Sequence, residues 1–272
     1  MAKVHLDKYY TKKEIAQKCL SLIPDFSSYH TIIEPSAGNG VFSNAIADCI
    51  AYDIAPECEN IIKQDFFLLN KIEGNNKLFL GNPPFGERSI LAKKFIQHAI
   101  QLGAETIAFI LPDTFSKFIM QKVFPLDWNL IVEENLGRDG FEIEAETYHV
   151  PCSFFVWTKR DSNINLRKKE LPKPRKIKFL PRLSQDADFT INGNNGKIKE
   201  LDEVTNWKSE HYIKVLVAAE KDSIKKQLSD IKYSFKSSVN GGNAWISQYE
   251  ILEEYYNKGI EQVSPTSVLT FW

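Results

Sequence analysis

Residues 31–40 read TIIEPSAGNG, a short run of β-type residues followed at once by a turn that contains two glycines. The run 31–33 predicts a strand, and residues 42–47 predict a helix after the turn. Gly38 and Gly40 would let the backbone come close to a ligand, and the first turn of the helix would offer free N–H groups. The spacing differs from G-x-G-x-x-G, so a dinucleotide pyrophosphate is not implied. An ordinary structural turn is the alternative interpretation.

The rest of the first 160 residues repeats this alternation of apolar β-type runs with helical periodicity. Such alternation is typical of a parallel sheet covered by helices on both faces, so we expect an α/β, Rossmann-like fold with a mostly parallel sheet. The late run VPCSFFVW is apolar on both faces, which predicts a central strand. The expected strands are 31–33, 50–53, 78–80, 106–111 and 150–157, and the expected helices are 11–24, 42–47, 89–102 and 115–123, the first opened by a capping box from Thr11 to Glu14.

The second half of the chain differs in charge and in pattern. The first 160 residues carry 16 basic and 20 acidic side chains, whereas the remainder carries 18 basic and 15 acidic ones. The change is sharpest at 167–178, RKKELPKPRKIK, where two prolines forbid a regular helix. We predict a domain at 1–160, a basic linker at 161–180 and a small α+β domain at 181–272. A linker that is merely solvated is the alternative.

Short motifs support the α+β interpretation of the last domain. The stretch FTINGNNGKI combines β-type residues with Asn-Gly turn chemistry, and 211–217 predicts a further strand. Helices are expected at 223–230 and 247–257. A second capping box, Ser247 to Glu250, would open the latter helix.

Composition and length exclude several classes of protein. The chain has 272 residues, of which 43% are hydrophobic and 25% are charged, and this composition is typical of globular domains. It contains no run of 18 apolar residues and its first ten residues lack an apolar signal region, so we expect a cytoplasmic protein with no membrane partner. The four cysteines show no C-x-x-C spacing and the histidines do not cluster with them, so neither a disulfide scaffold nor a metal site is expected.

Polar residues that follow the expected strands indicate a ligand, because ligands of open α/β sheets bind beyond the carboxyl ends of the strands. Asp53 ends the second strand and could accept hydrogen bonds from both hydroxyls of a ribose. Gln64, Asp65 and Phe66 place acceptors beside an aromatic ring, as the amino group and face of an adenine require. Each signal alone is weak, since an acidic residue at a strand end is often mere surface. Together with the glycine turn they suggest an adenosyl ligand.

The strongest signal is the segment 81–86, GNPPFG, directly after the apolar run LFL. An exocyclic amine of adenine is a poor nucleophile because its lone pair is delocalised into the ring. The Asn82 side-chain oxygen and the Pro83 carbonyl could accept its two hydrogens and localise that lone pair, so that the nitrogen could attack an electrophilic methyl group. Pro83 and Pro84 fix φ and remove competing N–H donors, and Phe85 would stack on the base. A rigid proline turn without chemistry is the alternative.

The segments E-P-S-A-G-N-G, Asp53, D-F and N-P-P-F, in this order and spacing, resemble the S-adenosylmethionine-dependent adenine-N6 DNA methyltransferases whose cofactor motifs precede the catalytic motif and whose target-recognition domain comes last. The resemblance implies a Rossmann-like methyltransferase domain, S-adenosylmethionine as cofactor and duplex DNA with a flipped adenine as substrate. It assigns Asn82, Pro83, Pro84 and Phe85 to catalysis, and Thr11, Glu34, Pro35, Gly38, Gly40, Asp53, Ile54, Asp65, Phe66 and Asn82 to the cofactor.

The resemblance also implies an aromatic residue, before the late strand, that covers the flipped base. Phe141 is our candidate and Tyr148 the reserve, with core packing as the alternative for either. Phosphate contacts are expected from the basic linker, at the three residues Lys173, Arg175 and Lys176. Asn243 and Trp245 could also touch DNA, although a core position is the more ordinary interpretation of Trp245.

Three other functions stay open at the level of sequence. N-P-P-F-G also occurs in enzymes that methylate adenine N6 in RNA, and a similar N-P-P-Y turn serves glutamine methylation of proteins. The third is a non-catalytic subunit of a methyltransferase complex. Such subunits usually lose the N-P-P-F or the glycine turn, and both are present here. Restriction–modification, with a companion restriction endonuclease, is a possible context for the DNA enzyme.

Overall fold

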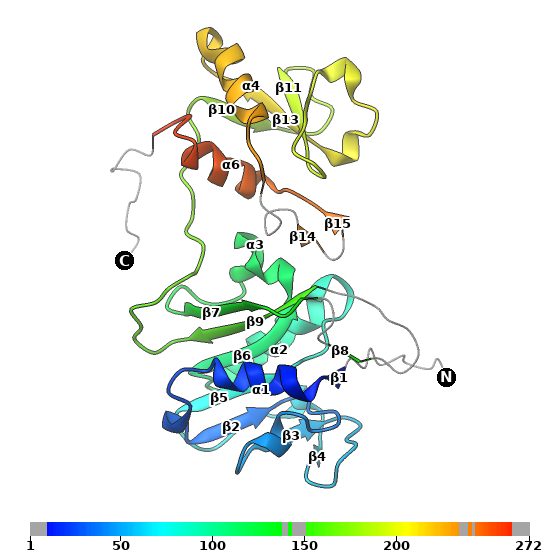
Figure 1. Cartoon of the computed structure of the whole chain (residues 1–272), viewed down its shortest axis with the longest axis vertical. Helices are drawn as coiled ribbons and strands as arrows, with labels where there is room; N and C mark the ends of the chain where they lie inside the picture. Colours follow the sequence, from blue (N-terminus) through cyan, green and yellow to red (C-terminus); the bar gives the residue numbers. More distant parts are fainter. Residues whose placement is uncertain (1–9, 138–140, 143–150, 234–238, 241–242, 263–272) are drawn as a thin grey trace. The chain divides into compact units, whose positions relative to one another are not determined.

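The computed structural model of the chain describes residues 10–137, 141–142, 151–233, 239–240 and 243–262, with the backbone alone at 141–142, 239–240 and 243–244 (Figure 1). The chain forms two compact units, Met1–Lys168 and Lys169–Trp272. Their boundary falls inside the predicted linker, 161–180. The last part of that range is strand β10 (Ile177–Leu180) of the second unit, so residues 177–180 are not linker.

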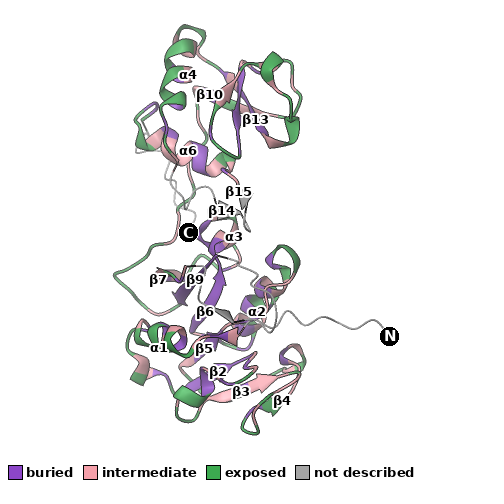
Figure 2. Cartoon of the chain, turned by 45° about the vertical axis from the view of Figure 1, so that its right-hand side comes forward, coloured by how far each residue is buried: buried purple, intermediate pink, exposed green. Residues whose placement is uncertain are grey.

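The first unit is built on a seven-stranded sheet with the strand order β4-β3-β2-β5-β6-β9-β7. The four pairs from β4 to β6 are parallel, whereas β9 is antiparallel to both β6 and β7. Every residue of β9 is buried between two neighbours, as its apolar sequence predicts (Figure 2). The predicted α/β fold with a mostly parallel sheet is confirmed. The strands are β2 (Thr31–Glu34), β3 (Ile50–Asp53), β4 (Ile62–Lys63), β5 (Lys77–Gly81), β6 (Thr106–Pro112), β7 (Asn129–Asn135) and β9 (Cys152–Thr158).

Helices cover both faces of this sheet, so that the unit has two apolar cores. Helix α2 (Ile90–Gln101) packs in one core and α1 (Lys13–Ser21) in the other. Strand β5 contributes Phe79 to the first core and Leu78 and Leu80 to the second, because successive side chains of a strand point to opposite faces. Within the described ranges, no helix combines the length and the apolar character needed to cross a membrane.

Two predicted helices are shorter than expected. Residues 42–47 form only the 3₁₀ turn Ser43–Ala45, since the short Ser- and Asn-containing run has side chains that compete with helical backbone bonds. Residues 115–123 are divided between the 3₁₀ turn Asp113–Ser116 and the single-turn helix α3 (Phe118–Gln121). The backbone of Lys117, which separates them, is extended and interrupts the helix.

The predicted capping box at the start of the chain is wrong. Lys12 is the N-cap residue of α1 and makes no side-chain cap bond. Thr11 belongs instead to strand β1 (Tyr10–Thr11), which pairs antiparallel with β8 (Phe141–Glu142). The spacing of Thr11 and Glu14 fits a capping box, but the strand pairing, which no local pattern indicates, draws Thr11 away from the helix.

The second unit is the predicted α+β module. Its antiparallel sheet has the order β10-β13-β11-β12, and α4 and α6 contribute to one apolar core with it. Helix α6 begins with the predicted capping box, in which Ser247 and Glu250 bond each other's backbone N–H groups. The remaining elements are β11 (Phe189–Asn192), β12 (Ile198–Lys199), β13 (Glu210–Val215), β14 (Val239–Asn240), β15 (Asn243–Ala244), α4 (Lys221–Ser229) and α6 (Gln248–Asn257).

Arg167, the first residue of the basic run, is half-buried and is bonded to the first unit. Its guanidinium donates hydrogen bonds to the backbone carbonyls of Phe124, Pro125 and Trp128. It also lies 5.5 Å from the ring centre of Trp157, on which Phe124 stacks with ring centres 4.1 Å apart. The guanidinium therefore satisfies the carbonyls that follow α3.

We expect Arg167→Lys to lower the free energy of unfolding by about 2 kcal/mol, because one ammonium group cannot replace a planar fork that serves three carbonyls. Chemical denaturation followed by tryptophan fluorescence measures this change. Lys94→Gln, at an exposed position on α2, is the control and should shift stability by less than about 0.5 kcal/mol. Equal stability of the two variants would contradict the assigned role of Arg167.

Candidate functional site

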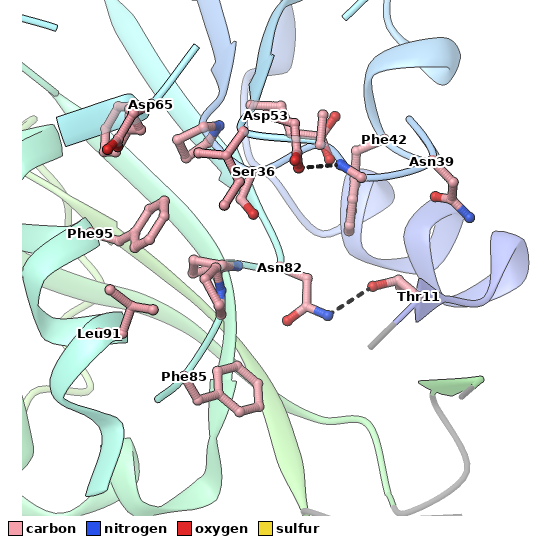
Figure 3. Close-up of a pocket in the computed structure, with 18 of the residues that line it drawn as sticks. Thr11, Ser36, Asn39, Phe42, Asp53, Asp65, Asn82, Phe85, Leu91 and Phe95 are labelled. Carbon is pink, nitrogen blue, oxygen red and sulfur yellow. Dashed lines mark hydrogen bonds between the residues drawn. The ribbon is translucent and has the colours of Figure 1, made fainter. Parts of the chain in front are cut away.

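A cavity of about 500 Å³ opens at the edge of the first unit's sheet where β2, β3 and β5 end. Small-molecule sites span roughly 300 to 1,000 Å³, so the cavity has room for a ligand of that class. Figure 3 shows side chains from the loops after these strands directed toward a common space. The predicted cofactor and catalytic residues that line it are Thr11, Glu34, Pro35, Gly38, Asp53, Ile54, Asp65, Phe66, Asn82, Pro83, Pro84 and Phe85.

The loop after β2 brings Glu34 and Gly38 to the cavity but not Gly40. Glu34 is 2% exposed, and its carboxylate accepts a hydrogen bond from the Ser43 backbone N–H at 2.9 Å. Gly38 and Gly40 have φ values of +52° and +76°, which side chains rarely allow. A Cβ at Gly40 would lie 2.8 Å from the side chain of Asn44. Gly40 therefore serves the geometry of the turn and is not among the cavity-lining residues, in contrast to the prediction.

Asp53 ties the loops after β2 and β3 together. Its two carboxylate oxygens accept hydrogen bonds from the backbone N–H groups of Gly38 and Ala55, each at 2.8 Å. Capacity for further donors remains, because a carboxylate offers about four lone-pair positions. The neighbouring Ile54 is apolar and yet 50% exposed where it lines the cavity. An acceptor beside an exposed apolar face suits a sugar that carries an aromatic base.

The loop after β4 contributes Asp65 and Phe66. The Asp65 carboxylate accepts a hydrogen bond from the Phe67 N–H at 2.9 Å, which fixes its direction. Phe66 is 2% exposed and stacks on Phe95 of α2, with ring centres 5.3 Å apart and planes inclined by 12°. Phe66 thus lines the cavity from within the core and offers little free surface for a ligand.

The segment 81–86 is held at both of its ends. Gly81 has a φ of +131°, and a Cβ there would lie 3.2 Å from the Glu34 side chain, so a larger residue would be strained. The carbonyl of Phe85 accepts two N–H groups of the first turn of α2, at 3.1 and 3.2 Å. Between these points the two prolines restrict the backbone. Asn82 and Phe85 are thereby presented to the cavity (Figure 3).

Strand β1 adds Thr11 to the site. The Asn82 side-chain nitrogen donates a hydrogen bond to the Thr11 hydroxyl at 3.2 Å. The backbone of Thr11 pairs with that of Phe141 in β8. The predicted base-stacking residue therefore lies next in the ladder to a cavity-lining residue, but the side chain of Phe141 lies outside the described part of the chain. Tyr148, the reserve candidate, also lies outside the described residues.

The described residues that line the cavity include three acidic side chains and no basic one. Burial raises the pKa of Glu34 from an ordinary value of 4.5 to about 8, against hydrogen bonds from Ser43 that lower it. Such a wall disfavours phosphate groups and favours a ligand that brings positive charge and hydroxyl donors. No group of three or more His, Cys, Asp or Glu side chains in the described part of the chain could hold a metal ion.

Several apolar residues of the cavity escape the sequence patterns, among them Phe42, Phe67, Leu91 and Phe95. Leu91 and Phe95 are four residues apart on α2, immediately after the segment 81–86. Their helical spacing next to the GNPPFG segment is a signal that could have identified them. Phe42 and Phe67 carry no such signal, because an aromatic residue beside a strand end is more often simply core.

Two of the three predicted phosphate contacts are engaged with carboxylates of the second unit. Arg175 donates to Glu261 at 3.2 Å through its side chain, and Lys176 donates to Glu220 at 2.7 Å. Lys173 is exposed. The positive charge of this run is thus partly neutralised locally, and Lys173 is the predicted contact most open to a phosphate.

Trp245 is a packing residue of the second unit. Its ring would lie 2.7 Å from a Cβ built on Gly193, and its ring centre lies 5.3 Å from that of His211. The absence of a side chain at position 193 makes room for the indole. The side chain of Asn243 lies outside the described residues.

No protein-family model matches the chain, and no curated protein matches it. Among solved structures, a candidate RNA methyltransferase from Pyrococcus horikoshii matches with a TM-score of 0.42 and 14% sequence identity, over 58% of this chain and 89% of that chain. A similarity of this size decides neither the activity nor the substrate of this chain. Both depend on the chemistry of the cavity.

The raised pKa of Glu34 predicts proton release when a cation binds beside it. Below pH 8 the free carboxyl group is protonated, and a nearby positive charge would favour the carboxylate. Binding of a positively charged ligand at pH 7 should therefore release up to one proton, and affinity should rise as the pH increases from about 6 to 8. Calorimetry in buffers of different ionisation enthalpy counts the protons.

Glu34→Gln is the matched variant, because it keeps the shape and removes the titration. This variant should bind the same ligand with little proton release. Its affinity should lack the rise that wild type shows between pH 6 and 8. Equal proton release by the two proteins would assign the titration to another group.

Proposed function

We propose that this chain transfers a methyl group from S-adenosylmethionine to the N6 amino group of adenine in DNA. The observation that carries the proposal is that the segment GNPPFG and the acidic loops share one cavity. Asn82 and Phe85 line the same space as Glu34 and Asp53. A group that polarises an amine thus lies beside a site suited to an adenosyl cation, which is the pairing that N6 methylation requires.

The residues of the cavity fit the proposed cofactor. The acidic side chains would favour its positively charged methionine part, and Asp53 keeps acceptor capacity for ribose hydroxyls. Ile54 offers an exposed apolar face to the adenine ring. When bound, S-adenosylmethionine supplies a methyl group on a positively charged sulfur. Nucleotides with phosphate chains fit less well, because the described lining residues contain no cation.

The chain's own contribution to the reaction would be positioning and hydrogen bonding. The Asn82 oxygen and the Pro83 carbonyl accept the hydrogens of the substrate amine and so localise its lone pair. The two prolines keep competing N–H donors out of the loop. Phe85, which lines the cavity next to Asn82, offers a face for stacking of the flipped base. Preorganised acceptors of this kind need no covalent intermediate.

DNA is the proposed acceptor because of the order of motifs, which resembles the adenine-specific DNA enzymes with a C-terminal target-recognition domain. In this proposal the second unit recognises the target site, the basic run contacts phosphates, and a companion restriction endonuclease is a possible partner. Adenine in RNA is the principal alternative acceptor, since the cavity chemistry described above is the same for both nucleic acids.

Asn82→Ala tests the role of the amide. We expect methyl transfer to fall by about 100-fold or more, because an acceptor aimed at the reacting amine is lost, while S-adenosylmethionine still binds. Transfer of labelled methyl groups and equilibrium dialysis measure the two effects. Asn70→Ala, the same change at an exposed position of the first unit, is the control and should behave like wild type. Near wild-type transfer by Asn82→Ala would refute the assigned role.

The acceptor class is tested by offering wild-type protein unmethylated duplex DNA, RNA and a protein extract in parallel with labelled cofactor. We expect label in DNA. Label in RNA alone, or in protein alone, would show that this molecule, and not DNA, is the acceptor. Cofactor binding without transfer to any of the three would favour a non-catalytic subunit.

Lys173→Gln tests the phosphate contact. The slope of log affinity for DNA against log salt should become shallower by about 0.9 for one lost contact. Lys71→Gln removes the same charge from an exposed pair with Glu73 in the first unit and is the control for net charge. If both variants keep the wild-type slope, Lys173 makes no phosphate contact and is only a solvated side chain.

A further inference from the structure

The contact between Asn82 and Thr11 joins the catalytic loop to the N-terminal strand. The two residues are 71 positions apart, and the Asn82 nitrogen lies 3.2 Å from the Thr11 hydroxyl oxygen. Thr11 is 5% exposed, so its side of this contact is buried, whereas Asn82 is half-buried. In Figure 3 the nitrogen of Asn82 points to Thr11, and its oxygen is turned to the side on which Phe85 lies.

The direction of the amide matters because its two ends have opposite chemistry. An amide oxygen accepts hydrogen bonds and an amide nitrogen donates them, yet the two ends are almost identical in size. The terminal torsion of asparagine is broad and roughly two-fold, so the side chain itself does not select one orientation. An amine substrate brings donors, and of the two ends of the Asn82 amide only the oxygen can accept one of them. A neighbouring group must therefore select the orientation.

We propose that Thr11 is a positioning residue that orients the Asn82 amide for catalysis. Its hydroxyl accepts the hydrogen bond of the amide nitrogen and thereby directs the amide oxygen to the substrate amine. This inference rests on the proposed function, and it gives Thr11 a role in the methyl-transfer step in addition to the cofactor contact that the resemblance implies.

The surroundings of Thr11 hold its hydroxyl in place. The backbone of Thr11 pairs with Phe141 in the β1–β8 ladder. On one side, the hydroxyl of Tyr10 donates a hydrogen bond to Glu57 at 2.5 Å. On the other side, the Lys12 carbonyl accepts the N–H of Ala16 and so begins α1. Thr11 is thus fixed between a strand pair and a helix start.

The loop that carries Asn82 is fixed as well. Gly81 is the last residue of β5 and lies against Glu34, whereas the Phe85 carbonyl is bonded to the first turn of α2. With the backbone restrained at both ends, the side-chain torsions of Asn82 are the main freedom that remains. The Thr11 hydroxyl accepts a hydrogen bond from the amide nitrogen at 3.2 Å. The geometry therefore couples correct folding of the N-terminal strand to the orientation of the catalytic amide.

Thr11→Val and Thr11→Ser form the test. Valine keeps the shape without the acceptor, and serine keeps the acceptor without the methyl group. At saturating cofactor and DNA, we expect Thr11→Val to lower the single-turnover rate by about tenfold, the effect of one hydrogen bond, and Thr11→Ser to recover most of it. The thermal midpoint and the cofactor Kd are measured on the same samples to show that both variants are folded.

A loss confined to the cofactor Kd, with a wild-type rate at saturation, would show that Thr11 serves the cofactor alone and would overturn the proposal. An equally slow Thr11→Ser would do the same, since the acceptor would then be irrelevant. If wild type transfers methyl groups to RNA or protein, the same ratios are measured with that acceptor. If wild type transfers none, the proposed function fails and this inference with it.

Asn82→Asp provides a second, independent readout. A carboxylate accepts hydrogen bonds at both ends, so it needs no group to choose between them. Adding Thr11→Val to Asn82→Asp should therefore cost much less than the tenfold expected in the wild-type background. The same fold-loss in both backgrounds would contradict an orienting role. A double-mutant cycle of this kind separates orientation from general damage to the loop.

Discussion

Parallel pairing of β2 with both β3 and β5 is the constraint on which the site depends. In this register Ile33 lies opposite Ile50 on one side and Phe79 on the other. The carboxyl ends of strands that run in the same direction lie at one edge of the sheet, so the three loops that follow these strands meet there. Asp53 then joins two of these loops through backbone N–H groups, and Gly81 lets the third lie against Glu34.

The electrostatics of the cavity follow from the same arrangement. Glu34 ends a strand whose residues are all buried, so its carboxyl group has little water and a raised pKa of about 8. A ligand that brings positive charge would relieve this cost, whereas a phosphate would increase it. The proposed cofactor thus matches a property that the fold creates before any ligand arrives, and the amide of Asn82 lies within the same cavity.

The sequence predicts the parts of the site that are governed by local chemistry. Gly38, Asp53 and the GNPPFG segment could be identified because they follow strand ends of one predicted sheet, where ligands of open α/β sheets bind, although each signal alone is weak. The main sheet, apart from short or polar strands such as β7, follows from apolar periodicity. Thr11 shows the limit of this reasoning, because its spacing to Glu14 fits a helix cap while its strand pairing draws it to Asn82. Long-range pairing of that kind leaves no local pattern. Gly40 is a motif residue with a positive φ that is not among the residues lining the cavity, which the local pattern could not indicate either.

In the proposed function, the amine that accepts the methyl group beside Asn82 belongs to adenine. Duplex DNA treated with the protein and isotopically labelled S-adenosylmethionine can be digested to nucleosides and resolved by mass spectrometry. We expect the label in N6-methyldeoxyadenosine and in no other nucleoside. Label in a methylated cytosine would show that the amide acts on a different amine. DNA that remains unlabelled, while the protein binds the cofactor, would contradict the account.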